Sequence, residues 1–207
     1  MSLALNDLEL VNSSVAGDIM AFEELVRRYE KKVFTIAFRM TGNREDAADL
    51  TQEAFIKAYR ALARFRGDAA FQTWLYHIIA NVCRDELRKK SRAFTLSLDY
   101  DKTLENGIIH REVADNAPGP DVFLENKEVG ESIQKAIDSL GLDYRMTLIM
   151  REIQGFSYEE ISDVLNCSIG TVKSRLSRAR AAVKNIFLAS GEHPPKESRQ
   201  INVKGGA

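Results

Sequence analysis

The sequence predicts an all-α protein with two helical domains joined by a long acidic linker, the second domain containing a helix-turn-helix. Three observations support this fold class. Apolar residues recur every three or four positions over most of residues 1–94 and 126–190, which is the period of an amphipathic helix. That period is lost over residues 95–125, where acidic residues and prolines gather. A capped two-helix unit begins at Ser157. The chain of 207 residues is long enough to form two cores.

The first domain, residues 1–94, is expected to contain four helices. They cover residues 6–16, 18–40, 44–64 and 70–90, and Gly17, Gly42 and Gly67 separate them. The third helix carries a second strip beside its core face, formed by Asp49, Gln52, Glu53, Ile56 and Arg60. An exposed apolar side chain among carboxylates and an amide suits a protein partner. An ordinary surface with one exposed isoleucine is the alternative, and spacing alone does not exclude it.

The fourth helix combines an aromatic residue, an amide and two arginines on one face. Trp74, His77, Asn81, Arg84 and Arg88 recur there every three or four residues. Aromatic rings stack on unpaired bases, amides read base edges and cations hold the phosphate backbone. This stripe therefore indicates a surface for single-stranded nucleic acid. The alternative is that Trp74 belongs to the core and the polar residues are simply solvated.

Residues 95–125 are interpreted as a linker. They contain seven acidic residues and only two basic ones, together with Pro118 and Pro120. This charge either mimics nucleic acid inside a basic channel or serves as a solubilising tether. The tail, residues 191–207, is polar, contains paired prolines and is expected to be disordered.

The second domain, residues 126–190, ends in the helix-turn-helix. Ser157 and Glu160 form a capping box for its first helix, and Ser168 can cap the second, which starts at Ile169. The second helix is expected to bury Ile169, Val172, Leu176, Ala179, Val183 and Phe187. Its opposite face carries Thr171, Ser174, Ser177, Arg178 and Ala181, flanked by Lys173, Arg175, Arg180 and Lys184.

That opposite face suits duplex DNA. Small polar side chains allow a helix to approach base edges in the major groove, and flanking cations pair with phosphates. Ser168 and the first N–H groups of the helix offer a further phosphate contact. No Asp or Glu occurs between Asn166 and Ser190. An ordinary solvated basic helix is the alternative.

The composition contains no sign of catalysis. The net charge is −1, and Cys83 and Cys167 are interpreted as structural thiols. The three histidines, His77, His110 and His193, lack the spacing of metal ligands. We therefore expect no catalytic residue, metal or cofactor. The N-terminus does not resemble a signal peptide and no apolar run reaches membrane-spanning length, so a cytoplasmic protein without membrane insertion is expected.

Three stretches carry a resemblance to a known family. They are DAADLTQEAFIKAYRAL (residues 46–62), FRGDAAFQTWLYHIIANVCRDELRKKSR (residues 65–92) and LIMREIQGFSYEEISDVLNCSIGTVKSRLSRAR (residues 148–180). In type, order and spacing they resemble bacterial RNA polymerase sigma factors of the extracytoplasmic-function (ECF) group, those similar to sigma-E. The resemblance covers nearly the whole chain except the linker and the tail. It implies an alternative sigma factor for a stress-type regulon, without enzymatic activity.

The resemblance also implies partners and site residues. The partners are core RNA polymerase, through its β′ coiled coil and β subunit, promoter DNA and an anti-sigma factor. Polymerase-binding positions would be Asp46, Asp49, Gln52, Glu53 and Ile56. Positions for the −10 element would be Phe65, Trp74, His77, Asn81, Arg84 and Arg88, with Asn81 reading a flipped-out base. Positions for the −35 element would be Ser168, Thr171, Lys173, Ser174, Arg175, Ser177 and Arg178.

The family often has an aromatic residue where this chain has Ser177, so the resemblance does not give the −35 sequence. Two other functions compete with a sigma factor. A stand-alone helix-turn-helix regulator would need only residues 126–190 to bind DNA, and would need neither the Trp74–Arg88 stripe nor the strip on residues 44–64. An enzyme acting on nucleic acid would need clustered carboxylates or metal ligands, and the sequence contains none.

Overall fold

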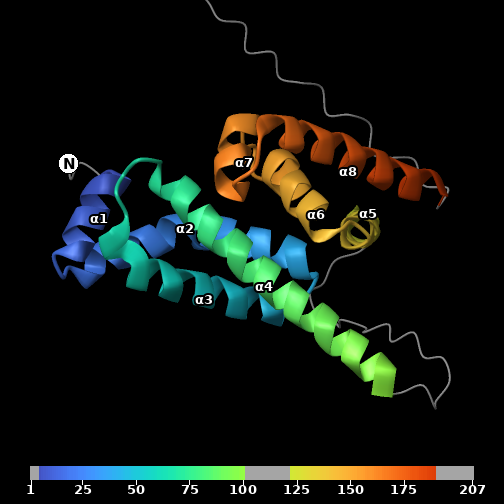
Figure 1. Cartoon of the computed structure of the whole chain (residues 1–207), viewed down its shortest axis with the longest axis horizontal. Coiled ribbons are helices and arrows are strands. Elements are labelled where there is room, and N and C mark those ends of the chain that lie inside the picture. Colours follow the sequence, from blue (N-terminus) through green and yellow to red (C-terminus); the bar gives the residue numbers. More distant parts are fainter. Residues whose placement is uncertain (1–4, 101–121, 190–207) are drawn as a thin grey trace, which may run out of the picture.

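The computed structural model describes residues 5–100 and 122–189, and within these ranges every regular element is a helix. The N-terminal helices form one layer and the C-terminal helices pack against it (Figure 1). The expected all-α fold class is therefore confirmed. The expected acidic linker falls mostly on residues 101–121, and the expected disordered tail falls on 190–207. Both lie outside the described residues.

The N-terminal helices begin and end where local chemistry favours it. Asn6, Asp18 and Asn43 cap α1, α2 and α3 by accepting hydrogen bonds from backbone N–H groups of the first turn. Gly42 ends α2 in the left-handed conformation, with φ of 67°. The elements are α1 (Asp7–Val15), α2 (Ile19–Thr41), α3 (Arg44–Ala61), the 3-10 turn η1 (Leu62–Arg64) and α4 (Phe71–Tyr100).

Small side chains let α3 lie close to its neighbours. Ala47, Ala54 and Ala58 of α3 are fully buried, and they belong to the same apolar cluster as the equally buried Leu25 and Val33 of α2. Alanine presents only a methyl group, so two helix backbones approach closely without leaving a cavity. The long helices α2, α3 and α4 therefore form a tight bundle.

The C-terminal helices include the expected helix-turn-helix. Its capping box is present: Ser157 Oγ accepts from the Glu160 N–H at 3.1 Å, and Glu160 Oε2 accepts from the Ser157 N–H at 2.8 Å. Asn166 makes the turn in the left-handed conformation, with φ of 48°. The elements are α5 (Val122–Asp138), α6 (Leu142–Leu148), the π-helical turn η2 (Ile149–Ile153), α7 (Tyr158–Leu165) and α8 (Ile169–Ala189).

Several details differ from the expectations. Helices α4 and α5 extend into both ends of the expected linker. Asp143 lies in the first turn of α6, which starts after Gly141, and its carboxylate pairs with Arg84 and Arg175. Ile169, expected in the core, is 38% exposed at the first position of α8.

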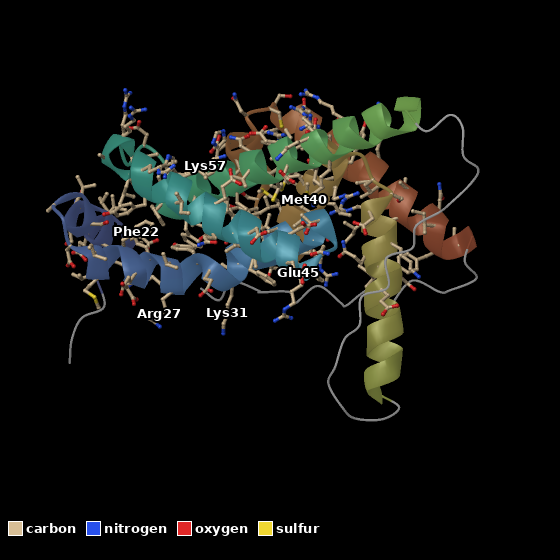
Figure 2. All side chains as sticks on the ribbon, turned by 90° about the horizontal axis from the view of Figure 1, so that it is seen from below. Phe22, Arg27, Lys31, Met40, Glu45 and Lys57 are labelled. Carbon is tan, nitrogen blue, oxygen red and sulfur yellow. The ribbon has the colours of Figure 1, made fainter. Side chains whose placement is uncertain are left out.

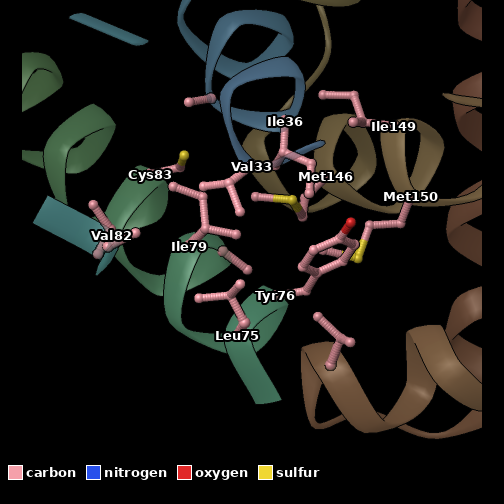
Figure 3. Packing of buried hydrophobic residues seen from close by; sticks show 14 of the residues in the cluster. Val33, Ile36, Leu75, Tyr76, Ile79, Val82, Cys83, Met146, Ile149 and Met150 are labelled. Carbon is pink, nitrogen blue, oxygen red and sulfur yellow. The ribbon is translucent and has the colours of Figure 1, made fainter. Parts of the chain in front are cut away.

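The two sets of helices share a continuous apolar core. Tyr76 of α4 is fully buried and its ring lies 5.1 Å from that of Phe156, in a tilted edge-on contact. Figure 3 shows Tyr76 pointing toward Met146 and Met150, both also buried. The division into separate domains stays a prediction, and the described helices pack as one body through this contact.

Candidate nucleic-acid and protein interfaces

The aromatic end of the α4 stripe is a cluster of three rings. Phe65 lies 5.2 Å from Trp74 and 5.9 Å from Phe71, measured between ring centroids, and Trp74 lies 5.7 Å from Phe71. Phe71 is buried, whereas Phe65 and Trp74 are half-buried. The sequence left open whether Trp74 is core or surface, and its side chain is partly both. Its packing fixes the ring while part of it stays accessible to a stacking partner.

The polar part of the stripe is already hydrogen-bonded. Asn81 Nδ2 lies 3.3 Å from His77 Nδ1, and Arg84 Nη1 donates to Asn81 Oδ1 at 2.9 Å. His77 and Arg88 are exposed, and Asn81 and Arg84 are half-buried. One helix therefore presents rings, an amide and cations in that order. The amide is held in place by the residues one turn before and after it.

The face of α8 is different, because its side chains are open to solvent and the central ones, Ser174 and Ser177, are short. Lys173, Ser174, Ser177 and Arg178 are all exposed. Ser168 caps the helix: its Oγ accepts from the Thr171 N–H at 3.1 Å and lies 2.9 Å from the Thr171 hydroxyl. Most of the expected −35 residues are thus brought together on one accessible side of α8.

Two arginines of α8 are tied to α6. Arg175 Nη2 lies 2.7 Å from Asp143 Oδ2, and Arg175 Nη1 lies 3.8 Å from Cys167 Sγ, so this half-buried guanidinium faces the domain itself. Arg178 Nη1 donates to the Tyr144 hydroxyl at 3.3 Å while the side chain stays exposed. Periodicity placed Arg178 on the polar face and Arg175 at its flank, but it did not show that both side chains contact α6.

A groove of about 960 Å³ runs between α2 and α3. Two residues of the expected polymerase-binding strip, Gln52 and Ile56, line it, and Ile56 is 43% exposed. Arg60 lines it as well. Asp49 and Glu53 are exposed on α3 but do not line it. Asp46 is held in an ion pair, with its Oδ2 2.7 Å from Lys90 Nζ.

Sequence reasoning missed the apolar half of this groove. Phe22, Val26 and Tyr59 line it, and the rings of Phe22 and Tyr59 pack at 4.9 Å. The repeat along α2 places Phe22 and Val26 in the same series as the buried Tyr29 and Val33, so the series resembled one core stripe. Figure 2 labels Phe22 on α2, whereas Arg27 and Lys31 project from the outer side of that helix.

Among the residues that the structure describes, no group of His, Cys, Asp and Glu side chains is arranged to hold a metal ion. Burial raises the pKa of the Cys83 thiol to about 12, so it stays protonated and unreactive at neutral pH. No helix in the described part of the chain is long and apolar enough to cross a membrane.

Comparison with known proteins gives the family. The family models of sigma-70 region 2 and sigma-70 region 4 match residues 25–93 and 130–183. The ECF RNA polymerase sigma-E factor of Escherichia coli K12 is 41% identical over 189 residues, covering 89% of this chain and 96% of its own length. The chain belongs to the ECF group of sigma-70 factors. The RNA polymerase sigma-H factor of Pseudomonas aeruginosa is 38% identical over 179 residues, covering 86% of this chain and 91% of its own.

Solved structures agree with the fold. CnrH, solved with the cytosolic domain of CnrY, aligns with a TM-score of 0.64 at 24% identity, covering 87% of this chain and 96% of its own. The sigma factor RpoE of Bartonella quintana, solved with the anti-sigma factor NepR, aligns with a TM-score of 0.61 at 24% identity. The alignment covers 82% of this chain and 98% of the RpoE chain. This sigma factor is thus a transcription initiation factor and not an enzyme, and the stand-alone regulator is set aside.

Proposed function

We propose that this sigma factor binds core RNA polymerase, and that the β′ coiled coil of the polymerase lies in the α2–α3 groove. The groove has an apolar floor and is lined by Gln52, and the exposed Asp49 and Glu53 lie beside it on α3. Exposed apolar surface rimmed by polar residues marks a protein interface. A helical partner lying between α2 and α3 would cover Ile56 and Tyr59, which are 43% and 49% exposed. We also propose that the polymerase β subunit contacts this sigma factor, and that Asp46, Asp49 and Glu53 contribute to polymerase binding outside the groove.

The α4 stripe is proposed to hold the unpaired strand of the −10 element. The observation that carries this assignment is the ordered series of Trp74, Asn81 and Arg84, in which the amide is held by His77 and Arg84 before any ligand arrives. A pre-positioned amide loses little freedom on binding a base. Phe65 and Trp74 supply the stacking surface, and Arg88 extends the cationic end of the stripe.

The exposed face of α8 is proposed to read the −35 element in the major groove. Ser174 and Ser177 are short enough to let the helix enter the groove, and Lys173 and Arg178 flank them. Ser168 and Thr171 lie at the helix N-terminus, where backbone N–H groups favour a phosphate. Arg175 is proposed to act at the edge of this surface, since Asp143 already engages it.

The decisive experiment is transcription in vitro. Purified protein is mixed with sigma-free core polymerase and fragmented genomic DNA, and the 5′ ends of the transcripts are mapped. Discrete start sites that share two spaced upstream elements are the expected result, and they would give the promoter consensus. Absence of specific initiation, together with tight duplex binding without core polymerase, would contradict the proposal and favour a stand-alone regulator.

The groove assignment has its own test. Ile56→Asp places a charge in the groove and should weaken binding to core polymerase at least tenfold. Val15→Asp is the matched control, because Val15 is 52% exposed on α1 and does not line the groove. Equal binding of both variants in a competition assay with core polymerase would rule the groove out.

An anti-sigma factor is proposed to regulate this protein in the cytoplasm, where it would direct a stress-type regulon. Support comes from two structural neighbours, which were solved with the cytosolic domain of CnrY and with the anti-sigma factor NepR. A dedicated inhibitor should copurify from unstressed cells and compete with polymerase for the α2–α3 groove. Recovery of polymerase alone in such a pull-down would remove this part of the proposal.

A further inference from the structure

The arginines along α8 differ in the groups that hold them. Arg175 Nη2 lies 2.7 Å from Asp143 Oδ2 of α6, and Arg180 Nη2 lies 2.5 Å from Glu152 Oε1 of η2. The hydrogen bond to Glu152 raises the pKa of Arg180. A guanidinium that already has a carboxylate partner must give up a strong, charge-assisted contact before it binds a base or a phosphate. The protein itself therefore partly neutralises these two cations.

Arg178, which lies between them in the sequence, is held by a neutral group instead. Its Nη1 donates to Tyr144 Oη at 3.3 Å, and within the described ranges it takes part in no ion pair. A phenol hydroxyl accepts this hydrogen bond without bringing a negative charge. The Arg178 side chain also remains exposed. The hydroxyl therefore orients this guanidinium and competes with a DNA ligand less than a carboxylate would.

The Tyr144 ring is a fixed support for that hydroxyl. The ring is half-buried and packs against the apolar core, whereas its contact with Arg178 lies at the surface. A Cβ built on Gly141 would lie 3.5 Å from Tyr144 Cδ2, so the backbone there lies against one edge of the ring. Thr147 Oγ1 donates to the Asp143 carbonyl at 2.6 Å and ties the first turn of α6 to the next. A tyrosine also has only two side-chain torsions to fix.

Helix α6 meets α8 along the edge of the proposed −35 surface. Asp143 and Tyr144 are neighbours in the first turn of α6, and their partners Arg175 and Arg178 lie one turn apart on α8. The carboxylate holds the half-buried arginine, and the phenol holds the exposed one. Arg178 is consequently the arginine of this pair that is open to DNA.

Orientation matters most for an arginine that reads a base. Two hydrogen bonds from one guanidinium to a base edge require the planar group to lie in the plane of the base. A contact that is made before binding lowers the cost of ordering a long side chain. Contacts with phosphates fix the position of a protein on DNA but do not read its sequence. A group that only orients Arg178 should therefore affect specificity more than general affinity.

We propose that Tyr144 is a positioning residue for −35 recognition, and that its hydroxyl directs the Arg178 guanidinium toward a base edge. This inference rests on the proposed function of the α8 face. It adds a specificity-determining residue that lies outside the helix-turn-helix. Loss of the hydroxyl should relax the choice of base at the positions that Arg178 reads. General attraction to duplex DNA should persist, because the guanidinium remains.

Selection from a DNA library tests this role. Holoenzyme assembled from the full chain is mixed with promoter fragments from the mapped start sites, in which the upstream element is randomised, and the bound sequences are counted. Arg178→Ala first identifies the base positions that depend on Arg178. Tyr144→Phe removes only the hydroxyl. It should lower the preference at those same positions about threefold to tenfold, as expected for the loss of one hydrogen bond, and leave the other positions unchanged.

Two further variants distinguish positioning from a general structural effect. Tyr158→Phe is the matched control, because Tyr158 is also half-buried and its hydroxyl contacts Arg180, which Glu152 already holds. Its preferences should match those of the parent at every position. The double variant Tyr144→Phe/Arg178→Ala should have the same preferences as Arg178→Ala alone, because the hydroxyl then has no guanidinium to orient.

The outcomes separate this inference from the proposed function. Unchanged preferences for Tyr144→Phe, an equal loss at every position, or a further loss in the double variant would overturn the positioning role and leave −35 recognition by α8 in place. Unchanged preferences for Arg178→Ala would show that Arg178 reads no base, and the role of Tyr144 would be lost with it. If the parent holoenzyme selects no upstream sequence, the proposed function of the α8 face itself fails, and Tyr144 has nothing to position.

Discussion

The α4 stripe and the α8 face both collect polar and basic side chains on one helix, yet they are built in opposite ways. In α4 the key side chains are half-buried and already paired, as in the contact of Asn81 with Arg84 at 2.9 Å. In α8 the corresponding side chains, such as Ser174 and Ser177, are short and exposed. The Asn81 amide of α4 is held by residues of the stripe itself, whereas Arg175 and Arg178 of α8 contact Asp143 and Tyr144 of α6.

This difference follows from the ligand that each surface is proposed to bind. A base pair in a duplex is held by its partner strand, so the protein needs only a helix that fits the groove. An unpaired base has no such support, and the protein must hold both the ring and its edge. Rigid, pre-paired side chains therefore suit α4, and small exposed ones suit α8.

The largest effect is expected from removing a buried side chain that packs α8 into the core. Leu176 is 1% exposed, so Leu176→Ala should lower the free energy of unfolding by about 2–5 kcal/mol. Duplex −35 binding should fall with it. Urea denaturation followed by circular dichroism measures the change. Leu188→Ala, on the same helix but 58% exposed, should stay within about 0.5 kcal/mol of the parent. A loss for Leu176→Ala as small as that for Leu188→Ala would place Leu176 outside the core.

Arg178→Ala should affect DNA binding by the α8 face without affecting binding by the α4 stripe. We expect −35 duplex binding by the holoenzyme to weaken by about 1–3 kcal/mol if the guanidinium contacts a base with two hydrogen bonds. Binding of a single-stranded −10 oligonucleotide should not change. Fluorescence anisotropy with both probes measures this, and Arg27→Ala, exposed on α2, controls for loss of charge. A uniform loss on all duplex sequences would assign Arg178 to the phosphate backbone.

Asn81→Ala should affect DNA recognition by the α4 stripe without affecting binding by the α8 face. Discrimination at one −10 position should fall by about 1–3 kcal/mol, because the amide that reads the base is removed, while −35 duplex binding stays intact. Competition between −10 oligonucleotides that differ at single positions gives the measurement. Asn12→Ala, exposed on α1, is the control, and an equal effect on every −10 sequence would remove the base-reading role.

The smallest effect concerns acid stability near α1. Hydrogen bonds from Arg27 and Arg28 lower the pKa of Glu24 from 4.5 to about 2. Because this pKa is lower in the folded protein, the ionised carboxylate stabilises the fold above about pH 4.5, and that stability is lost as the pH falls toward 2. Glu24→Gln should therefore lower stability slightly at neutral pH, with the difference vanishing toward pH 2. Urea titrations at several pH values, with Glu23→Gln as control, measure it; a difference independent of pH would contradict the ion pair.

The sequence by itself determined the helices and most of the candidate surfaces. Capping residues such as Asn43 and Ser157 satisfy backbone groups within three residues, so the helix starts are legible from local sequence. The stripe from Trp74 to Arg88 and the face around Ser174 follow from helical period alone. The resemblance of three stretches to ECF sigma factors was equally available from the residues, and the family is confirmed.

Only the tertiary structure decided which apolar and charged residues belong to which surface. Phe22 and Tyr29 share one period on α2, but Phe22 lines the groove, whereas Tyr29 is buried and its ring packs against that of Phe71 in α4. Asp143 and Arg145 resemble ordinary helix residues, yet one pairs with Arg84 and the other donates to Met40, more than a hundred residues away in sequence for Arg145. Helical period fixes the direction of a side chain relative to its own axis. What that side chain meets depends on how separate helices pack.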